Sequence, residues 1–149
     1  MSTIQRKEIL EVLISMPVQK LKRIIFLENL DSIRLCLSAA ALVWAGLLYW
    51  PGDTFNRPTY NLMNYVAGEL WWATAFLLQG VVMLMALLYD YRDRFVLLFD
   101  CVMGCVLWSA GTVMMLLSVY PPPAAISAEI VMAFASWWVL VRFLADEVE

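Results

Sequence analysis

The sequence predicts an all-α integral membrane protein in which a four-span transmembrane helix bundle follows an amphipathic interfacial helix. Composition is the first reason, because 63% of the 149 residues are hydrophobic, whereas a soluble domain is nearer half apolar. The second reason is that the apolar residues form four runs of about membrane-spanning length, separated by short polar segments. The third reason is the uneven placement of the positive charges along the chain.

Residues 1–32 are expected to form a helical arm on the cytoplasmic surface of the membrane. Apolar side chains recur there at helical spacing and form one stripe, with charged side chains opposite. Pro17 favours the start of a second helix over a position inside one. A basic amphipathic helix before a span commonly lies on the cytoplasmic leaflet, and the alternative is a cytoplasmic helix that packs on a protein partner. The basic residues expected at the membrane surface are Lys20, Lys22 and Arg23.

The remainder of the chain, residues 33–149, is expected to form the membrane bundle. Charges, prolines and interfacial aromatic residues mark the ends of the spans. The one long connection is residues 51–68, which is expected to hold a short helix around residues 59–66. The predicted spans are residues 33–50, 69–89, 95–120 and 124–144.

The ten Lys and Arg residues predict the orientation of this bundle. All but Arg57 fall on the side that also holds both chain termini. Because Lys and Arg collect in cytoplasmic segments, the sequence predicts a multi-pass membrane protein with an N-in, C-in orientation. The residues on the cytoplasmic side are Arg6, Lys7, Lys20, Lys22, Arg23, Arg34, Arg92, Arg94 and Arg142.

Several kinds of function are disfavoured by what the sequence lacks. It has no histidine, which is the commonest metal ligand and general base, and no Gly-rich phosphate loop. A net charge of −3 gives no basic field for nucleic acid. Cys36, Cys101 and Cys105 do not form a CxxC motif and are expected to be small buried apolar residues. The sequence therefore predicts no enzyme, no cofactor, no metal site and no nucleic-acid partner.

Asp100 is the first of two acidic residues expected inside the spans, where a charge costs about 2.5–3.5 kcal/mol on insertion scales. It shares a helical face with the small residues Gly104 and Gly111, so this face should point into the bundle. Arg34 and Arg142 are expected at the same depth on neighbouring spans. Two interpretations stay open: a structural ion pair that fixes the helices, and a proton or cation site.

Glu129 is expected in the opposite leaflet, with no basic residue near it except Arg57. A carboxyl without a counter-charge in apolar surroundings favours its neutral form. It could be a protonated group bonded to Gln79, Thr74 or a backbone carbonyl, or a titrating site open to the outside. Gln79, near the middle of the second span, could link Glu129 to Asp100 along one polar path.

Two functions are compatible with these residues. The architecture resembles that of many small bacterial and bacteriophage inner-membrane proteins, although the resemblance extends to no motif. It favours a non-enzymatic protein of the bilayer that assembles with itself, or with a membrane or cytoplasmic partner, as a structural, holin-like or membrane-effector protein. The alternative is a small proton- or ion-coupled transporter or channel that uses the intramembrane acids.

Overall fold

The described part of the chain, in a computed structural model, is entirely helical. It contains five α-helices and two short 3₁₀ helices, and no strand lies within the described residues. Most of the predicted arm, residues 1–28, lies outside the described residues. The basic residues Lys20, Lys22 and Arg23 belong to this part. The described residues are 29–50, 54–89, 93–122, 124 and 126–145.

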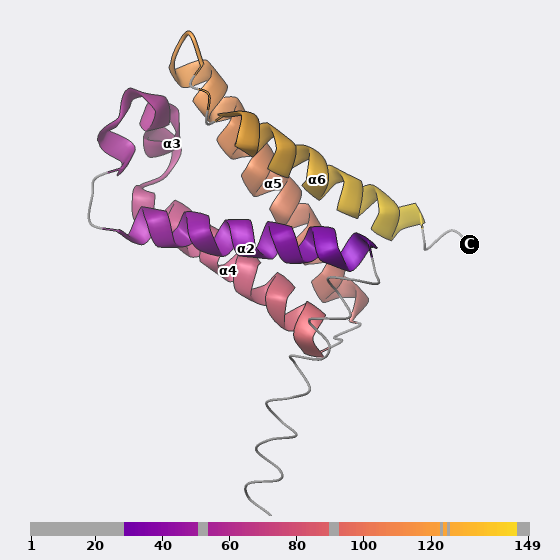
Figure 1. The fold of residues 1–149 in the computed structure, drawn as a ribbon. Helices are drawn as coiled ribbons and strands as arrows, with labels where there is room; N and C mark the ends of the chain where they lie inside the picture. The colour runs from indigo at the N-terminus through magenta and orange to yellow at the C-terminus, as the bar shows by residue number, and fades with distance from the viewer. Residues whose placement is uncertain (1–28, 51–53, 90–92, 123, 125, 146–149) are drawn as a thin grey trace, which may run out of the picture.

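Four of the described helices are long and apolar enough to cross a membrane (Figure 1). The second helix has the predicted bounds, 69–89, and the other three differ from the predicted spans by one to four residues at each end. The first helix begins four residues earlier than predicted, because Asp31 lies in its first turn, where the helix dipole favours an acid. The four helices are α2 (Asn29–Tyr49), α4 (Glu69–Tyr89), α5 (Arg94–Ser118) and α6 (Ile126–Ala145).

The start of α5 is fixed by an N-cap. The Asp93 carboxylate accepts hydrogen bonds from the backbone N–H of Phe95 at 2.9 Å and of Val96 at 3.4 Å. These N–H groups have no partner within the helix, so the cap satisfies them. The charged turn that precedes α5 in the sequence therefore ends in a defined helix start.

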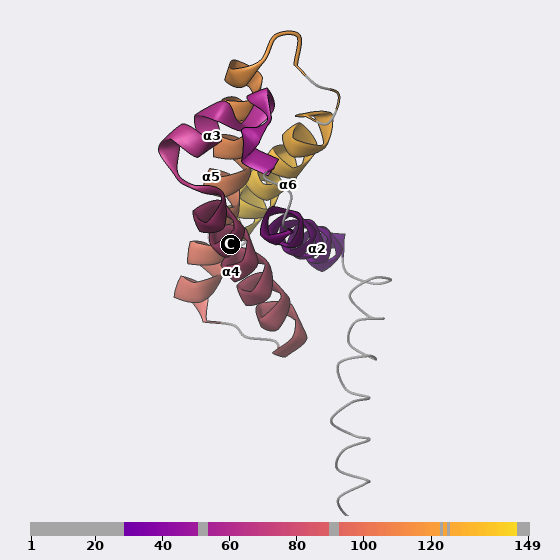
Figure 2. The same ribbon diagram turned by 90° about the vertical axis from the view of Figure 1, so that its left-hand side faces the viewer.

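The long helices pack as two pairs, α2 with α4 and α5 with α6 (Figures 1 and 2). Small residues allow the first pair to approach closely. The Ser38 hydroxyl donates to the Gly80 carbonyl oxygen at 2.7 Å, and a Cβ on Gly80 would lie 2.9 Å from Cγ of Leu42. The small residues of this pair that are buried between helices are Ser38, Ala41, Ala45, Ala73 and Gly80.

A short helical cap covers one end of the bundle. It consists of η1 (Thr54–Asn56), η2 (Pro58–Tyr60) and α3 (Asn61–Val66), so the expectation of a short helix in the long connection is confirmed. The indole N–H of Trp72 donates to the Met63 carbonyl oxygen at 3.1 Å, and the backbone N–H of Leu62 donates to Oγ of Ser118 at 3.4 Å. We call this the cap end, and the opposite end, where α2 and α5 begin, the basal end.

One cysteine prediction is wrong. Cys101 and Cys105 are buried as expected, but Cys36 is exposed. It lies on the face of α2 that turns away from the bundle, while Leu37 and Ser38 beside it are buried, because successive helical residues differ in direction by about 100°. Its apolar character suits a lipid-facing surface as well as a core, so composition alone could not distinguish the two.

Candidate functional site

One face of α5 carries polar and small residues into the interior of the bundle. Asp100, Gly104, Leu107 and Gly111 follow one another at intervals of four, three and four residues, and all four are buried. These intervals keep the residues on one side of a helix. At 1.5 Å of rise per residue, the line from Asp100 to Gly111 extends for about 16 Å along the axis. The predicted inward face of this helix is confirmed.

Two neighbouring helices place polar side chains against the middle of this face. A Cβ on Gly104 would lie 3.4 Å from Nε2 of Gln79 on α4 and 3.8 Å from Oγ of Ser136 on α6. Gln79 is buried, its Nε2 lies 3.9 Å from Sδ of Met83, and its Oε1 has no hydrogen-bond partner within the described chain. The Ser136 hydroxyl donates to the Met132 carbonyl oxygen at 2.8 Å. Gln79 of α4 and Ser136 of α6 therefore lie at the same depth in the bundle as Gly104 of α5.

Asp100 lies one turn from that level toward the basal end. It is 2% exposed, and neither of its carboxylate oxygens has a hydrogen-bond partner among the described residues. Arg34 on α2 is the cation whose charge acts on Asp100. The Arg34 guanidinium itself contacts Asp31, with 3.5 Å between Nη1 and Oδ1, while its buried Nε and Nη2 have no partner in the described part of the chain. A buried acid and a partly buried base therefore keep unused hydrogen-bonding groups.

Arg142 does not join this basal site. Its side chain is exposed on α6, where it borders a surface pocket with Leu30, Ile33 and Trp138. Within the described residues it forms no ion pair with Asp100. Of the two arginines expected at the depth of Asp100, the structure brings Arg34 toward it and leaves Arg142 on the surface.

Glu129 lies at the other end of the same α5 face. It is 6% exposed, and its Oε2 has no hydrogen-bond partner among the residues described. A Cβ on Gly111 would lie 3.8 Å from this oxygen. Thr74, considered above as a partner, instead donates its hydroxyl to the Leu70 carbonyl oxygen at 2.7 Å and contacts the Tyr49 hydroxyl at 2.9 Å. Glu129 therefore approaches α5 where α5 lacks a side chain.

The structure adds Tyr60 of the cap to the surroundings of Glu129. The Tyr60 ring stacks on Phe55 with 5.5 Å between centroids and lies 6.2 Å from the Trp44 ring. Burial raises the pKa of the Tyr60 phenol, the charge of Glu129 raises it further, and Arg57 lowers it. The sequence offered no signal for this approach, because it depends on how the cap packs against α5.

Two tryptophans add unused donors to the interior. Trp44 on α2 and Trp108 on α5 both pack on Phe76 of α4, with ring centroids 6.4 Å and 5.0 Å away. The indole N–H of each is buried without a partner in the described chain. Buried polar groups of this kind are commonly satisfied by water. The interior therefore offers both donors and acceptors to bridging water.

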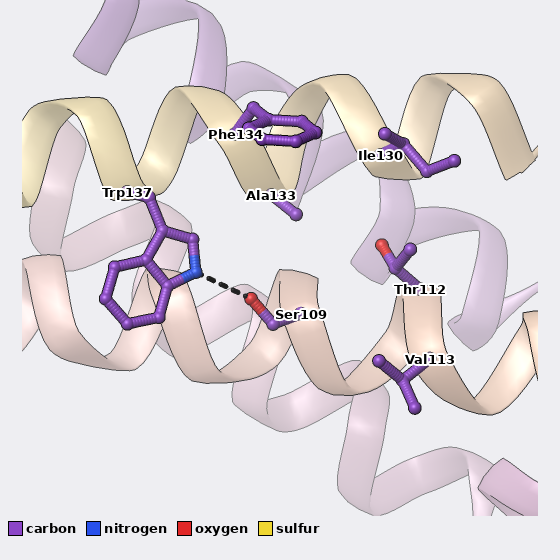
Figure 3. A pocket seen from close by; sticks show the side chains of 7 residues that line it. All are labelled: Ser109, Thr112, Val113, Ile130, Ala133, Phe134 and Trp137. Atoms are coloured by element: carbon purple, nitrogen blue, oxygen red, sulfur yellow. Dashed lines mark hydrogen bonds between the residues drawn. The ribbon is translucent and has the colours of Figure 1, made fainter.

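The outward side of the α5–α6 pair has a different character. A groove opens there, and within it the indole N–H of Trp137 donates to Oγ of Ser109 at 3.0 Å (Figure 3). The hydrogen bond gives the Trp137 indole N–H a partner on an apolar surface, and it uses none of the polar groups inside the bundle. The groove is lined by Ser109, Thr112, Val113, Ile130, Ala133, Phe134 and Trp137.

The chain matches no protein-family model, and comparisons with curated proteins and with solved structures find no similar protein. Function must therefore be argued from the site itself. We call the interior set the polar track, defined as Arg34, Gln79, Asp100, Glu129 and Ser136.

Proposed function

We propose that this chain is a non-enzymatic multi-pass membrane protein whose polar track transfers protons or other cations across the bilayer. One observation carries the proposal: Gln79, Asp100 and Glu129, from three helices, bury oxygen atoms without a hydrogen-bond partner in the described chain. An unsatisfied buried group costs about 1–3 kcal/mol, and more when it is charged. Ionisable residues kept inside a membrane at such a cost typically mark proton or ion pathways.

Insertion in the membrane is supported by the four long apolar helices and by the large apolar side chains on their outer surface. A soluble protein rarely exposes so much contiguous apolar surface. The distribution of Lys and Arg supports a cytoplasmic basal end and an outer cap end. In this orientation both termini are cytoplasmic, and a bacterial inner membrane is the membrane we propose.

In the proposed polar track, Glu129 and Asp100 are two proton-binding sites, or stations, that act one after the other. Glu129 exchanges protons with the outer side near the cap, and Asp100 exchanges them with the cytoplasm near the basal end. The distance of about 16 Å along α5 is too long for a direct transfer, so water between the stations must carry the proton. The unused groups of Gln79 and Trp108 provide partners for that water.

Proteoliposomes that enclose a pH-sensitive dye would test this function. Under an imposed pH gradient, we expect Asp100→Asn and Glu129→Gln each to reduce the proton flux at least tenfold, because each removes a titrating station. Ser109→Ala is the matched control, since it deletes a polar group from the outward side of α5 and should leave the flux unchanged. Wild-type flux in both acid variants, with only their thermal stability reduced, would contradict the proposal.

Assembly with itself or with a partner, in a structural or holin-like role, is a second candidate. It is favoured by the exposed aromatic face of α6, where Phe134 is 74% and Trp137 50% exposed beside the groove (Figure 3). The mass of the detergent-extracted protein would distinguish a ring from a dimer or monomer. Vesicle permeability that rises steeply with protein concentration and ignores both acids would favour a pore formed by assembly over the polar track.

A further inference from the structure

We infer that the polar track is specific for protons, and that Arg34 imposes this specificity by pairing its guanidinium alternately with Asp31 and with Asp100. The inference rests on the proposed function. It adds the identity of the transferred ion and the residue that selects it.

The two helices that carry these groups meet α4 at one level. On α2, the Ser38 hydroxyl bonds to the Gly80 carbonyl oxygen at 2.7 Å. On α5, Gly104 receives the Gln79 amide, whose Nε2 would lie 3.4 Å from a Cβ there. Because Gln79 and Gly80 are consecutive, α2 and α5 have the same depth at Ser38 and Gly104.

Arg34 and Asp100 are each placed four residues before that level. α2 and α5 both run from the basal end toward the cap end (Figure 1). Arg34 is therefore one turn to the basal side of Ser38, and Asp100 is one turn to the basal side of Gly104, on the same helix faces. This places the backbone positions of Arg34 and Asp100 at about the same depth, so the long Arg34 side chain, which contacts Asp31 in the structure, starts level with the Asp100 carboxyl.

The hydrogen-bonding groups on both sides are suited to an exchange. In the structure, Arg34 is held by Asp31 through Nη1, while Nε and Nη2 have no partner within the described residues. Both oxygens of Asp100 are equally unused. This arrangement corresponds to a protonated, neutral Asp100, which does not compete with Asp31 for the guanidinium.

One cycle of proton transfer through Asp100 then needs one proton and no other reactant. When the O–H bond of Asp100 breaks and the proton leaves toward the basal side, the carboxylate becomes negative. Nε–H and Nη2–H of Arg34 can donate to it, and the guanidinium shifts from Asp31 to Asp100. A proton arriving from the cap end protonates Asp100 again and returns Arg34 to Asp31. Arg34 keeps its own charge throughout, because a guanidinium is not deprotonated in proteins.

No other described charge competes at this site. Cys101 is the buried titratable neighbour on α5, while Gln79 and Ser136 bring no charge from α4 and α6. The remaining ionisable groups at the basal end are exposed on the helix surfaces. They are Tyr89 on α4, Asp93 and Arg94 at the start of α5, and Arg142 on α6.

A metal cation would bind poorly at this position. Na⁺ or K⁺ beside Asp100 would meet the positive charge of Arg34, and like charges repel strongly in a medium of low dielectric constant. Hard cations also take several oxygen ligands, whereas Asp100 brings a single buried carboxyl to this position. A proton needs only the one carboxyl.

Wild-type protein in proteoliposomes tests the ion directly. We expect a dye-reported proton flux of equal rate in Na⁺, K⁺ and N-methyl-D-glucamine buffers, and no uptake of ²²Na⁺ or ⁸⁶Rb⁺ above that of empty vesicles. Proton flux accompanied by uptake of either tracer would overturn the proton specificity and leave the proposed function standing. The absence of any flux would overturn both.

Two variants test the exchange by shifting the pH profile of the flux in opposite directions. With Arg34→Gln, Asp100 loses its counter-ion and retains its proton, so half-maximal flux moves up by about one pH unit or more. With Asp31→Asn, Arg34 stays with Asp100, so half-maximal flux moves to lower pH. Arg34→Lys and the surface variant Arg142→Gln should keep a profile close to that of the wild type.

A purely structural role for Arg34 would give a different result. It would lower the thermal stability of the Arg34→Gln protein without moving the pH profile, and that outcome would overturn the exchange. If Arg34→Gln does not fold, the Asp31→Asn variant tests the exchange alone. Asp31 is more exposed than Arg34, so its substitution disturbs the packing less, and this variant still contains Arg34. An unchanged profile in Asp31→Asn would then contradict the inference.

Discussion

At the scale of single residues, Tyr60 reports on the electrostatics of the cap end. Its phenol is half-buried in the cap, and two charges of opposite sign act on it from different parts of the chain. Glu129 and burial raise the pKa of Tyr60, whereas Arg57 lowers it. Because Tyr60 lies outside the long helices, its titration can be followed without perturbing the packing of the bundle.

The pKa of Tyr60 should therefore shift in opposite directions in two variants. Glu129→Gln removes a negative charge that disfavours the phenolate, so the pKa should fall, and Arg57→Gln removes a positive charge that favours it, so the pKa should rise. Ultraviolet difference titration would measure both shifts, with Tyr60→Phe identifying the signal. Equal shifts in the same direction would show that Glu129 does not face the cap.

At the scale of helices, the α2–α4 pair depends on the absence of a side chain at one position. A Cβ on Gly80 would lie 2.9 Å from Cγ of Leu42 and 3.1 Å from the Ser38 carbonyl oxygen. Backbone cannot move away as easily as the end of a side chain, so the two helices would have to separate. Gly46, also in a long helix, has no neighbour within 4 Å of a Cβ.

These two glycines give a matched pair of substitutions. Gly80→Ala should destabilise the protein by about 1–3 kcal/mol through overpacking. Gly46→Ala should be neutral or stabilising by up to about 1 kcal/mol, because alanine favours a helix over glycine. Denaturant unfolding of both variants in one detergent would measure the difference. Equal effects would show that α2 and α4 do not approach closely at Gly80.

The sequence predicts helix faces better than contacts between helices. The inward face of α5 follows from the spacing of Asp100, Gly104 and Gly111, since small and polar residues stand out against an apolar background. The partners of Arg34 and Glu129 do not follow, because they depend on helix rotation and on the fold of the cap. Helices that are apolar on every side give no amphipathic pattern from which these rotations could be predicted.

At the scale of the whole molecule, the four long helices and the short helix of the cap are the features that the sequence predicts best. The bounds of α4 are those predicted, whereas those of α2, α5 and α6 move by one to four residues, since charged residues near a membrane surface can extend a helix as well as end it. The exposure of Cys36 and the surface position of Arg142 were not predictable, because lipid-facing and buried positions draw on the same residue types.

The proposed orientation predicts the behaviour of fusion proteins. Alkaline phosphatase, which is active only outside the cytoplasm, should be inactive when fused after Glu149 and active when fused after Asn56 in the cap. Green fluorescent protein should show the reverse pattern of fluorescence, because it folds in the cytoplasm. Activity of the phosphatase at both positions would exclude the N-in, C-in arrangement that the positive charges predict.

The central claim is that Asp100 and Glu129 belong to one pathway, and a double-variant comparison of proton flux tests it most directly. If the two acids act in series, the Asp100→Asn/Glu129→Gln protein should lose no more flux than the slower single variant, since blocking either station blocks the path. Their effects on thermal stability should instead be close to additive, because the two sites are far apart. Single variants with wild-type flux, or losses that multiply in the double variant, would contradict a single polar track.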